Sequence, residues 1–175
     1  MSARKLALCG LFICFAGALS ALETLLPPIV PIPGVRVGLG NIVILFVLYL
    51  GGKWRAADAL VISVLRCFLA ALITGSLMNA AFGVVGGAFA LAAMLVMKKL
   101  LPDERYLPFA GVAGALLHII GQLLTAAVFY GTFSVLAYLP ILISSAIIGG
   151  AFTGLCTMLL LRKLNKKLLD GVRNV

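Results

Sequence analysis

Six apolar segments, separated by short connections, dominate this chain and restrict what it can fold into. They cover residues 6–26, 37–50, 59–78, 80–97, 107–130 and 139–161. A chain of 175 residues that is 63% hydrophobic cannot bury this much apolar surface in a soluble core. Because a segment in lipid must satisfy its own backbone hydrogen bonds, we expect each one to be a transmembrane helix. The sequence therefore predicts a single all-α integral membrane domain of six helices over residues 1–175.

The basic residues orient these predicted helices. If all six segments cross, twelve of the fourteen Lys and Arg residues fall on one side, and Arg36 and Arg66 are the exceptions. Positively charged connections ordinarily remain in the cytoplasm. We therefore expect both termini in the cytoplasm and a multi-pass protein of the cell membrane. The net charge of +9 does not indicate nucleic-acid binding, because the cations form short clusters and no continuous basic face.

Two of the predicted helices leave alternatives open. The first follows Arg4 and Lys5, and we interpret it as a retained span, although the same pattern fits a cleaved signal peptide ending near Ser20. The second, residues 37–50, is shorter than the roughly 20 residues that a span needs. Either this helix is tilted, or the preceding connection completes it by dipping into the membrane.

The segment from Glu23 to Asn41 contains four prolines, three glycines and one cation. Its prolines restrict the backbone, whereas Gly38 and Gly40 allow another part of the chain to approach closely. A guanidinium held in such a segment can make bidentate bonds to a phosphate or a carboxylate. Arg36 is therefore the main candidate for substrate binding, and the alternative is an arginine that reaches the lipid phosphates.

A second arginine, Arg66, lies well inside the third predicted helix. A guanidinium is costly to bury in lipid and ordinarily faces the bundle interior, a cavity or a carboxylate. The candidate partners are Glu23, near the outer end of the first helix, and Asp58, which is closer to the cytoplasm. Arg66 can thus serve either structure or ligand binding, and Glu23 is counted among the candidate binding residues.

Four further polar side chains complete the predicted binding site. His118 and Gln122 share one face of the fifth helix because they are four residues apart. Such a pair can hold a polar head group, or it can hydrogen-bond a neighbouring helix. Asn41 and Asn79 lie near the outer ends of the second and third helices, where each can cap a helix or line an outer pocket.

Small residues indicate where helices approach each other. A stripe on one face of the first helix admits a close neighbour, from this protein or from a partner subunit. It consists of Gly10, Cys14, Gly17 and Ala21. The sequence Gly-Gly-Ala-Phe occurs at 86–89 and again at 149–152, either as a relic of duplication or as convergent use of small residues.

All four cysteines lie in apolar segments without a Cys-x-x-Cys pair, so we expect no metal site.

The sequence resembles a known family over essentially the whole chain, most specifically at Glu23–Asn41. The matching residues are Leu-Glu-Thr-Leu-Leu-Pro-Pro, followed by Pro-Ile-Pro-Gly-Val-Arg-Val-Gly-Leu-Gly-Asn. With the six-helix layout, they resemble the Gx transporter family, also called heptaprenyl diphosphate synthase component I. That family is similar to the substrate-binding S components of energy-coupling factor (ECF) importers. The resemblance implies an S-component-like bundle whose pocket opens outward, with Arg36 and Asn41 at its gate. It also implies that the small-residue stripe docks to a transmembrane coupling subunit, which two ATPase subunits power.

The motifs of the corresponding enzymes are missing from the sequence. Prenyl diphosphate synthases hold magnesium and diphosphate with Asp-Asp-x-x-Asp motifs, and here no two aspartates are adjacent. The chain also lacks a Gly-x-x-x-x-Gly-Lys-Ser/Thr loop for ATP phosphates. We expect a non-enzymatic subunit, without a cofactor, that captures a small anionic or amphipathic vitamin- or isoprenoid-related compound from outside. The alternatives are a non-catalytic membrane subunit associated with polyprenyl diphosphate synthesis and a structural membrane-assembly protein.

Overall fold

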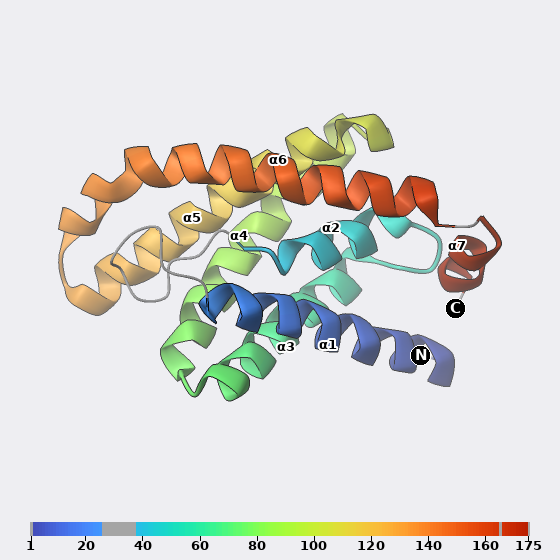
Figure 1. The fold of residues 1–175 in the computed structure, drawn as a ribbon, viewed down its shortest axis with the longest axis horizontal. Coiled ribbons are helices and arrows are strands. Elements are labelled where there is room, and N and C mark those ends of the chain that lie inside the picture. Colours follow the sequence, from blue (N-terminus) through green and yellow to red (C-terminus); the bar gives the residue numbers. More distant parts are fainter. Residues whose placement is uncertain (1, 26–37, 165, 175) are drawn as a thin grey trace.

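The computed structural model describes residues 2–25, 38–164 and 166–174, and this part of the chain is helical (Figure 1). Five of its helices are long and apolar enough to cross a membrane. They are α1 (Ala3–Leu25), α3 (Ala56–Thr74), α4 (Leu77–Leu100), α5 (Leu107–Tyr130) and α6 (Leu139–Lys163). Two 3-10 helices, Glu104–Tyr106 and Phe133–Tyr138, lead into α5 and α6. The five long apolar helices indicate a multi-pass membrane protein.

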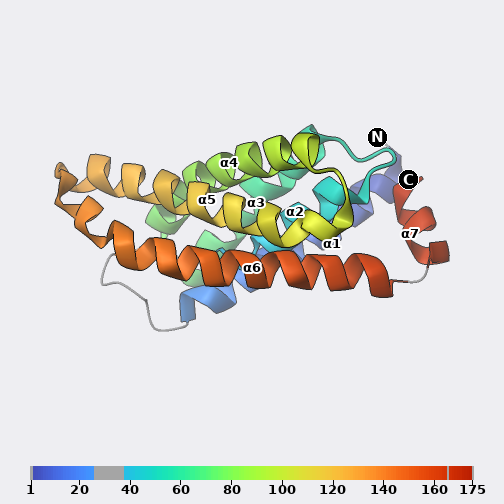
Figure 2. The same ribbon diagram turned by 90° about the horizontal axis from the view of Figure 1, so that it is seen from above.

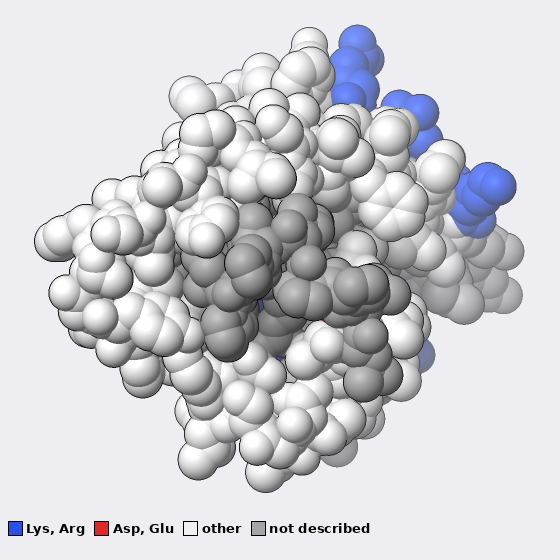
Figure 3. All heavy atoms as spheres, turned by 60° about the vertical axis from the view of Figure 1, so that its left-hand side comes forward, with Lys and Arg blue, Asp and Glu red and all other residues white. Residues whose placement is uncertain are grey.

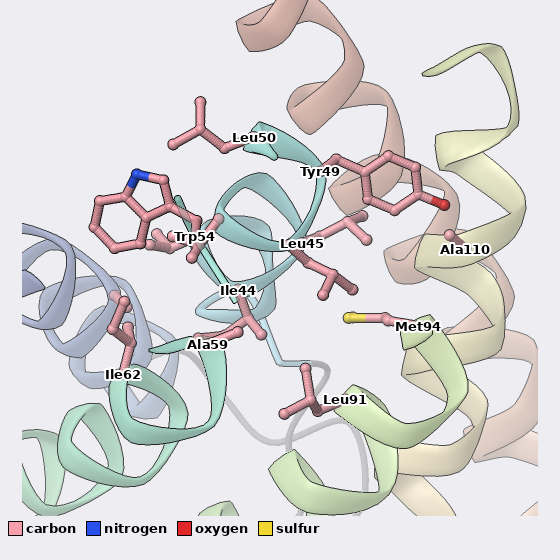
Figure 4. Packing of buried hydrophobic residues seen from close by; sticks show 14 of the residues in the cluster. Ile44, Leu45, Tyr49, Leu50, Trp54, Ala59, Ile62, Leu91, Met94 and Ala110 are labelled. Atoms are coloured by element: carbon pink, nitrogen blue, oxygen red, sulfur yellow. The ribbon is translucent and has the colours of Figure 1, made fainter. Parts of the chain in front are cut away.

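A short helix, α2 (Asn41–Leu50), lies at the centre of the bundle and contacts each of the five long helices. Nine of its ten residues are buried. In Figure 4 its side chains Ile44 and Leu45 face Leu91 and Met94 of α4. Ten helical residues rise only about 15 Å, half of the roughly 30 Å hydrocarbon layer. In this structure α2 is therefore a buried core helix, too short to cross a membrane by itself.

Two glycines set helix boundaries that differ from the predicted ones. Gly38 has a φ of +91°, which a helical residue does not adopt, so α2 begins at Asn41 rather than at residue 37. Gly75 caps α3 in the left-handed conformation with a φ of +68°, and α3 ends at Thr74 rather than at residue 78. The next helix starts at Leu77, so only a tight turn joins α3 to α4.

Successive helices alternate in direction, and both chain termini lie at one end of the bundle, beside the small helix α7 (Lys166–Arg173) (Figures 1 and 2). We call this the basic end, because the described connections and helix termini there carry most of the cations. Its basic side chains are Arg4, Lys5, Lys53, Arg55, Lys98, Lys99, Arg105, Arg162, Lys163 and Arg173. Figure 3, with the opposite end of the bundle brought forward, shows a described surface that is almost entirely uncharged.

Side chains at the basic end join the first and last parts of the chain. Trp54 Nε1 donates to the Val172 carbonyl at 2.8 Å, and Arg173 Nε donates to the Leu50 carbonyl at 2.7 Å. Lys5 Nζ, from the start of α1, forms a part-buried ion pair with Asp58 at 2.8 Å. Asp58 therefore neutralises Lys5, and the predicted alternative in which it draws Arg66 toward this end is wrong.

Close glycine contacts hold α5 between α4 and α6 (Figure 2). A Cβ added at Gly150 of α6 would lie 2.6 Å from Val112 Cα, and one added at Gly86 of α4 would lie 3.0 Å from Gln122 Cγ. Both copies of the Gly-Gly-Ala-Phe sequence thus place a glycine against α5. Small residues serve close helix packing at both positions, as expected for helices in a membrane.

Candidate functional site

A narrow polar pocket lies among α1, α3, α4 and α5, next to the turn that precedes α2. It brings together five of the seven predicted binding residues, which come from four different helices. Its lining consists of Ser20, Glu23, Gly38, Arg66, Cys67, Ala70, Asn79, Gly83, His118 and Gln122. Asn41 is linked to this lining through Arg66. Arg36 lies outside the described residues, so its role stays a prediction.

Arg66 is the most buried charge of the pocket, with 2% of its surface exposed. Its Nη1 donates to Ser20 Oγ at 2.9 Å, and its Nη2 donates to Asn41 Oδ1 at 2.6 Å. The backbone of Gly40 leaves room for this arrangement, because a Cβ there would collide with Arg66 Nη1 and with Ser20 Oγ. Arg66 Nε is buried as well, and it has no hydrogen-bond partner among the described residues.

Glu23 is buried near the end of α1 and holds the turn before α2. Its Oε1 accepts from the Gly38 amide at 2.7 Å, and its Oε2 accepts from the Leu39 amide at 2.8 Å. The Asn41 amide then donates to the Gly38 carbonyl at 2.9 Å, which closes the turn. Among the described residues no ion pair joins Glu23 to Arg66, although both line the pocket. Direct pairing with Glu23, one of the two alternatives left open for Arg66, is therefore absent from this part of the structure.

His118 and Gln122 form the α5 wall of the pocket, and both are almost fully buried. Their predicted common face points toward α4, where Gly86 makes room for them. Asn79 belongs to the α4 wall, and its Nδ2 donates to Thr74 Oγ1 at 3.4 Å across the α3–α4 turn. The pocket thus combines a guanidinium, a carboxylate, an imidazole and two amide side chains. The pocket's volume of about 20 Å³ limits what this set can hydrogen-bond to a small polar group within apolar surroundings.

Only half of the predicted docking stripe on α1 is buried within this protein. Gly17 and Ala21 are buried, and a Cβ at Gly17 would lie 2.8 Å from Leu69 Cδ2 of α3. Gly10 and Cys14 are exposed, and no atom lies within 4 Å of a Cβ built at Gly10. The half of the stripe remote from the basic end therefore serves packing within this protein, and the half nearer the basic end is exposed.

Sequence reasoning missed several lining residues, most of them small. Ser20 lies three residues before Glu23, and Gly83 lies four residues after Asn79, so helical spacing would have placed both beside predicted residues. Cys67 and Ala70 follow Arg66 on α3 and carry no polar signal of their own that could have identified them.

Fold and site together define the class of this protein: a multi-pass membrane protein with a buried polar pocket between apolar helices. The family described as heptaprenyl diphosphate synthase component I matches residues 12–160, and the chain belongs to this family. The matched range contains all of the pocket-lining residues. It is also the family that the sequence resembles. No curated protein and no solved structure matches the chain.

Proposed function

We propose that this protein is the substrate-binding transmembrane subunit of an ECF-like importer. It captures a small anionic or amphipathic vitamin- or isoprenoid-related compound from the extracytoplasmic side and holds it without covalent chemistry. The observation that carries this proposal is the burial of a guanidinium and a carboxylate, Arg66 and Glu23, in one pocket between membrane helices. Charges are rare inside membrane domains, and where they line a cavity they ordinarily mark the path of a substrate or an ion.

In this proposal six segments cross the membrane, and α2 completes its crossing together with the chain that precedes it. The basic end faces the cytoplasm, as the distribution of Lys and Arg favours. The pocket then lies toward the outside, because Glu23 is near the end of α1 that is remote from the basic end. Both chain termini are cytoplasmic in this orientation.

Partner subunits would supply the energy, because the sequence has no loop for ATP phosphates. The open half of the stripe, Gly10 and Cys14, is the proposed contact with a transmembrane coupling subunit. Small exposed residues allow the backbone of a second helix to approach closely in lipid. Two ATPase subunits bound to that coupling subunit would drive transport, while the remaining apolar surface contacts membrane lipids.

Affinity purification of the tagged full-length protein from its native membranes tests this function. We expect a coupling subunit and two ATPases to be recovered, and we expect Gly10→Leu to lose them because the added side chain fills the open half of the stripe. Ala18→Leu is the matched control, since Ala18 is exposed on α1 but lies outside the stripe. Recovery of the same ATPases with Gly10→Leu would reject the proposed docking face.

A second candidate is a non-catalytic membrane subunit associated with polyprenyl diphosphate synthesis. The description of the matching family favours it, because that description names a component of a heptaprenyl diphosphate synthase. The same purification separates the two candidates. Recovery of a soluble prenyl diphosphate synthase, without ATPases, would replace the transport proposal by this one.

Arg36 is proposed as a second binding residue at the gate of the pocket. We expect Arg36→Ala to reduce ligand uptake, whereas Arg105→Ala, which removes an exposed cation at the basic end, should leave uptake unchanged. Uptake that is the same for Arg36→Ala and the unmodified protein would remove Arg36 from the site.

A further inference from the structure

All five acidic side chains of this protein lie in the described part of the chain. Three of them neutralise cations at the basic end, in the pairs Lys5–Asp58, Arg105–Asp103 and Arg173–Asp170. Glu23 uses both of its oxygens to hold backbone amides. Glu104 belongs to the 3-10 helix before α5, at the basic end. None of the five lies within 4.0 Å of a nitrogen of Arg66.

Arg66 is therefore a buried cation whose described partners are neutral oxygens. The hydroxyl of Ser20 and the amide oxygen of Asn41 fix the two terminal nitrogens, which leaves Nε with no partner among the described residues. A buried charge without a countercharge carries a large desolvation penalty, whereas a paired and hydrogen-bonded charge recovers much of it. A role in packing alone does not require this penalty, because an uncharged side chain could fill the same space.

We propose that Arg66 binds one anionic group of the ligand, a carboxylate or a phosphate, which supplies the missing countercharge. This inference rests on the proposed substrate-binding function and names the chemistry that the pocket selects. Ser20 and Asn41 hold the guanidinium in place before the ligand arrives, so little side-chain entropy is lost on binding. The bond to the anion is charge-assisted and forms away from bulk water, where it is strongest.

Glu23 limits how much negative charge the ligand can carry. Its carboxylate lines the same pocket as Arg66, and like charges at close range oppose each other. A ligand with a single anionic group gains the attraction of Arg66 with the least repulsion from Glu23. The pocket should therefore favour acetate or inorganic phosphate over diphosphate.

Isothermal titration of the purified full-length protein, in a maltoside detergent free of phospholipid, tests this assignment. We expect acetate and inorganic phosphate to bind, diphosphate to bind more weakly, and acetamide, the uncharged analogue of acetate, not to bind. Arg66→Gln should weaken binding of both acetate and inorganic phosphate by about tenfold or more, the usual effect of losing a hydrogen bond to a charged group. Arg105→Gln is the matched control, because it removes a surface cation and should leave both affinities unchanged.

Three results would overturn the inference: equal binding of acetamide and acetate, undiminished anion binding by folded Arg66→Gln, or tighter binding of diphosphate than of phosphate. The comparison of acetate with acetamide uses the unmodified protein and so does not depend on how a variant folds. Added phosphatidylglycerol identifies the source of the anion, because Arg66-dependent binding of this lipid alone would indicate a headgroup. Import of an uncharged compound by a complex with intact ATPases would reject this inference and leave the proposed function standing.

Discussion

Two buried basic residues, Lys5 at the basic end and Arg66 in the pocket, differ in what neutralises them. Lys5 is 7% exposed, forms an ion pair with Asp58 at 2.8 Å and donates to the Lys53 carbonyl at 3.0 Å. Its ammonium also lies 5.2 Å from the centre of the Trp54 ring. Arg66 is 2% exposed and donates to neutral oxygens only, within the described part of the chain. The protein itself supplies the countercharge of Lys5, whereas in our proposal a ligand supplies that of Arg66.

The surroundings of Lys5 and Arg66 also differ, since one region is mainly apolar and the other is polar. Around α2 and the start of α3, toward the basic end, apolar side chains pack densely against one another, as Figure 4 shows for Ile44, Trp54 and Ile62. Around Arg66, polar side chains from four helices converge on a pocket. The basic end is therefore packed mainly with apolar side chains, whereas the pocket brings polar side chains together. Substitutions in the two regions should test this difference.

The largest loss of stability should follow from breaking the part-buried pair at the basic end. We expect Lys5→Met to lower the free energy of unfolding by about 3–5 kcal/mol, because Asp58 is then left part-buried without its partner. Unfolding in mixed micelles measures this, with Arg4→Met, which removes an exposed neighbouring cation, as control. The double substitution Lys5→Met with Asp58→Leu should recover most of the loss. Equal effects of Lys5→Met and Arg4→Met would show that the pair contributes little.

A smaller loss should follow from crowding the pocket arginine. Gly40→Ala places a Cβ against Arg66 Nη1 and Ser20 Oγ, which forces the guanidinium to move. We expect a loss of about 1–3 kcal/mol, as is usual for overpacking, together with weaker anion binding. Thermal unfolding and titration with acetate measure the two effects. Gly10→Ala is the control, since its Cβ meets no atom within 4 Å and should change neither quantity. Normal acetate binding by Gly40→Ala would contradict the assigned geometry.

Removing the pocket cation itself should affect stability less than removing Lys5. Arg66→Met deletes the hydrogen bonds to Ser20 and Asn41, but it also deletes a buried charge that lacks a carboxylate partner in the described structure. Because these effects oppose each other, we expect a net change within about 1 kcal/mol. Unfolding under the conditions used for Lys5→Met allows direct comparison. A loss as large as that of Lys5→Met would mean that Arg66 is mainly structural.

The most local effect should appear at α7. Trp54→Phe removes the hydrogen bond to the Val172 carbonyl, which we expect to contribute about 1 kcal/mol. Hydrogen exchange of amides 169–174 should become faster, while exchange in α5 stays unchanged. Tyr49→Phe, which removes a longer bond of 3.4 Å to the Leu101 carbonyl, should leave α7 protected. Unchanged exchange in Trp54→Phe would show that other contacts, such as that of Arg173 with Leu50, suffice to hold α7.

The helical class, the family and five of the pocket-lining residues could be predicted from the sequence, because polar and charged residues inside an apolar segment are visible without a structure. Arg66 was expected to face the interior or a cavity, and it lines the pocket. Its partners could not be predicted, since the contact of Ser20 with Arg66 depends on how α1 packs against α3. Glu23 was one of two candidate partners of Arg66, but it holds two backbone amides instead, and such contacts leave no sequence signal.

The helix ends and the central position of α2 could not be predicted from the sequence either. The apolar sequence continues past Gly75 to Met78, yet Gly75 adopts the left-handed conformation and ends α3 at Thr74. The shortness of the second helix was visible from the sequence, but its central position was not, because that position depends on contacts with all five long helices. The helix α7 was missed because it follows the last apolar run and is held by contacts with Trp54 and Leu50 far away in the sequence.

Native mass spectrometry of the protein purified from its own membranes tests the central claim most directly. The comparison is between the unmodified chain, Arg66→Gln and the surface control Arg105→Gln. The account predicts a retained small molecule with an anionic group on the unmodified protein and on Arg105→Gln, and its loss from folded Arg66→Gln. Retention of the same molecule by all three proteins would contradict the claim that the buried guanidinium of Arg66 binds the ligand.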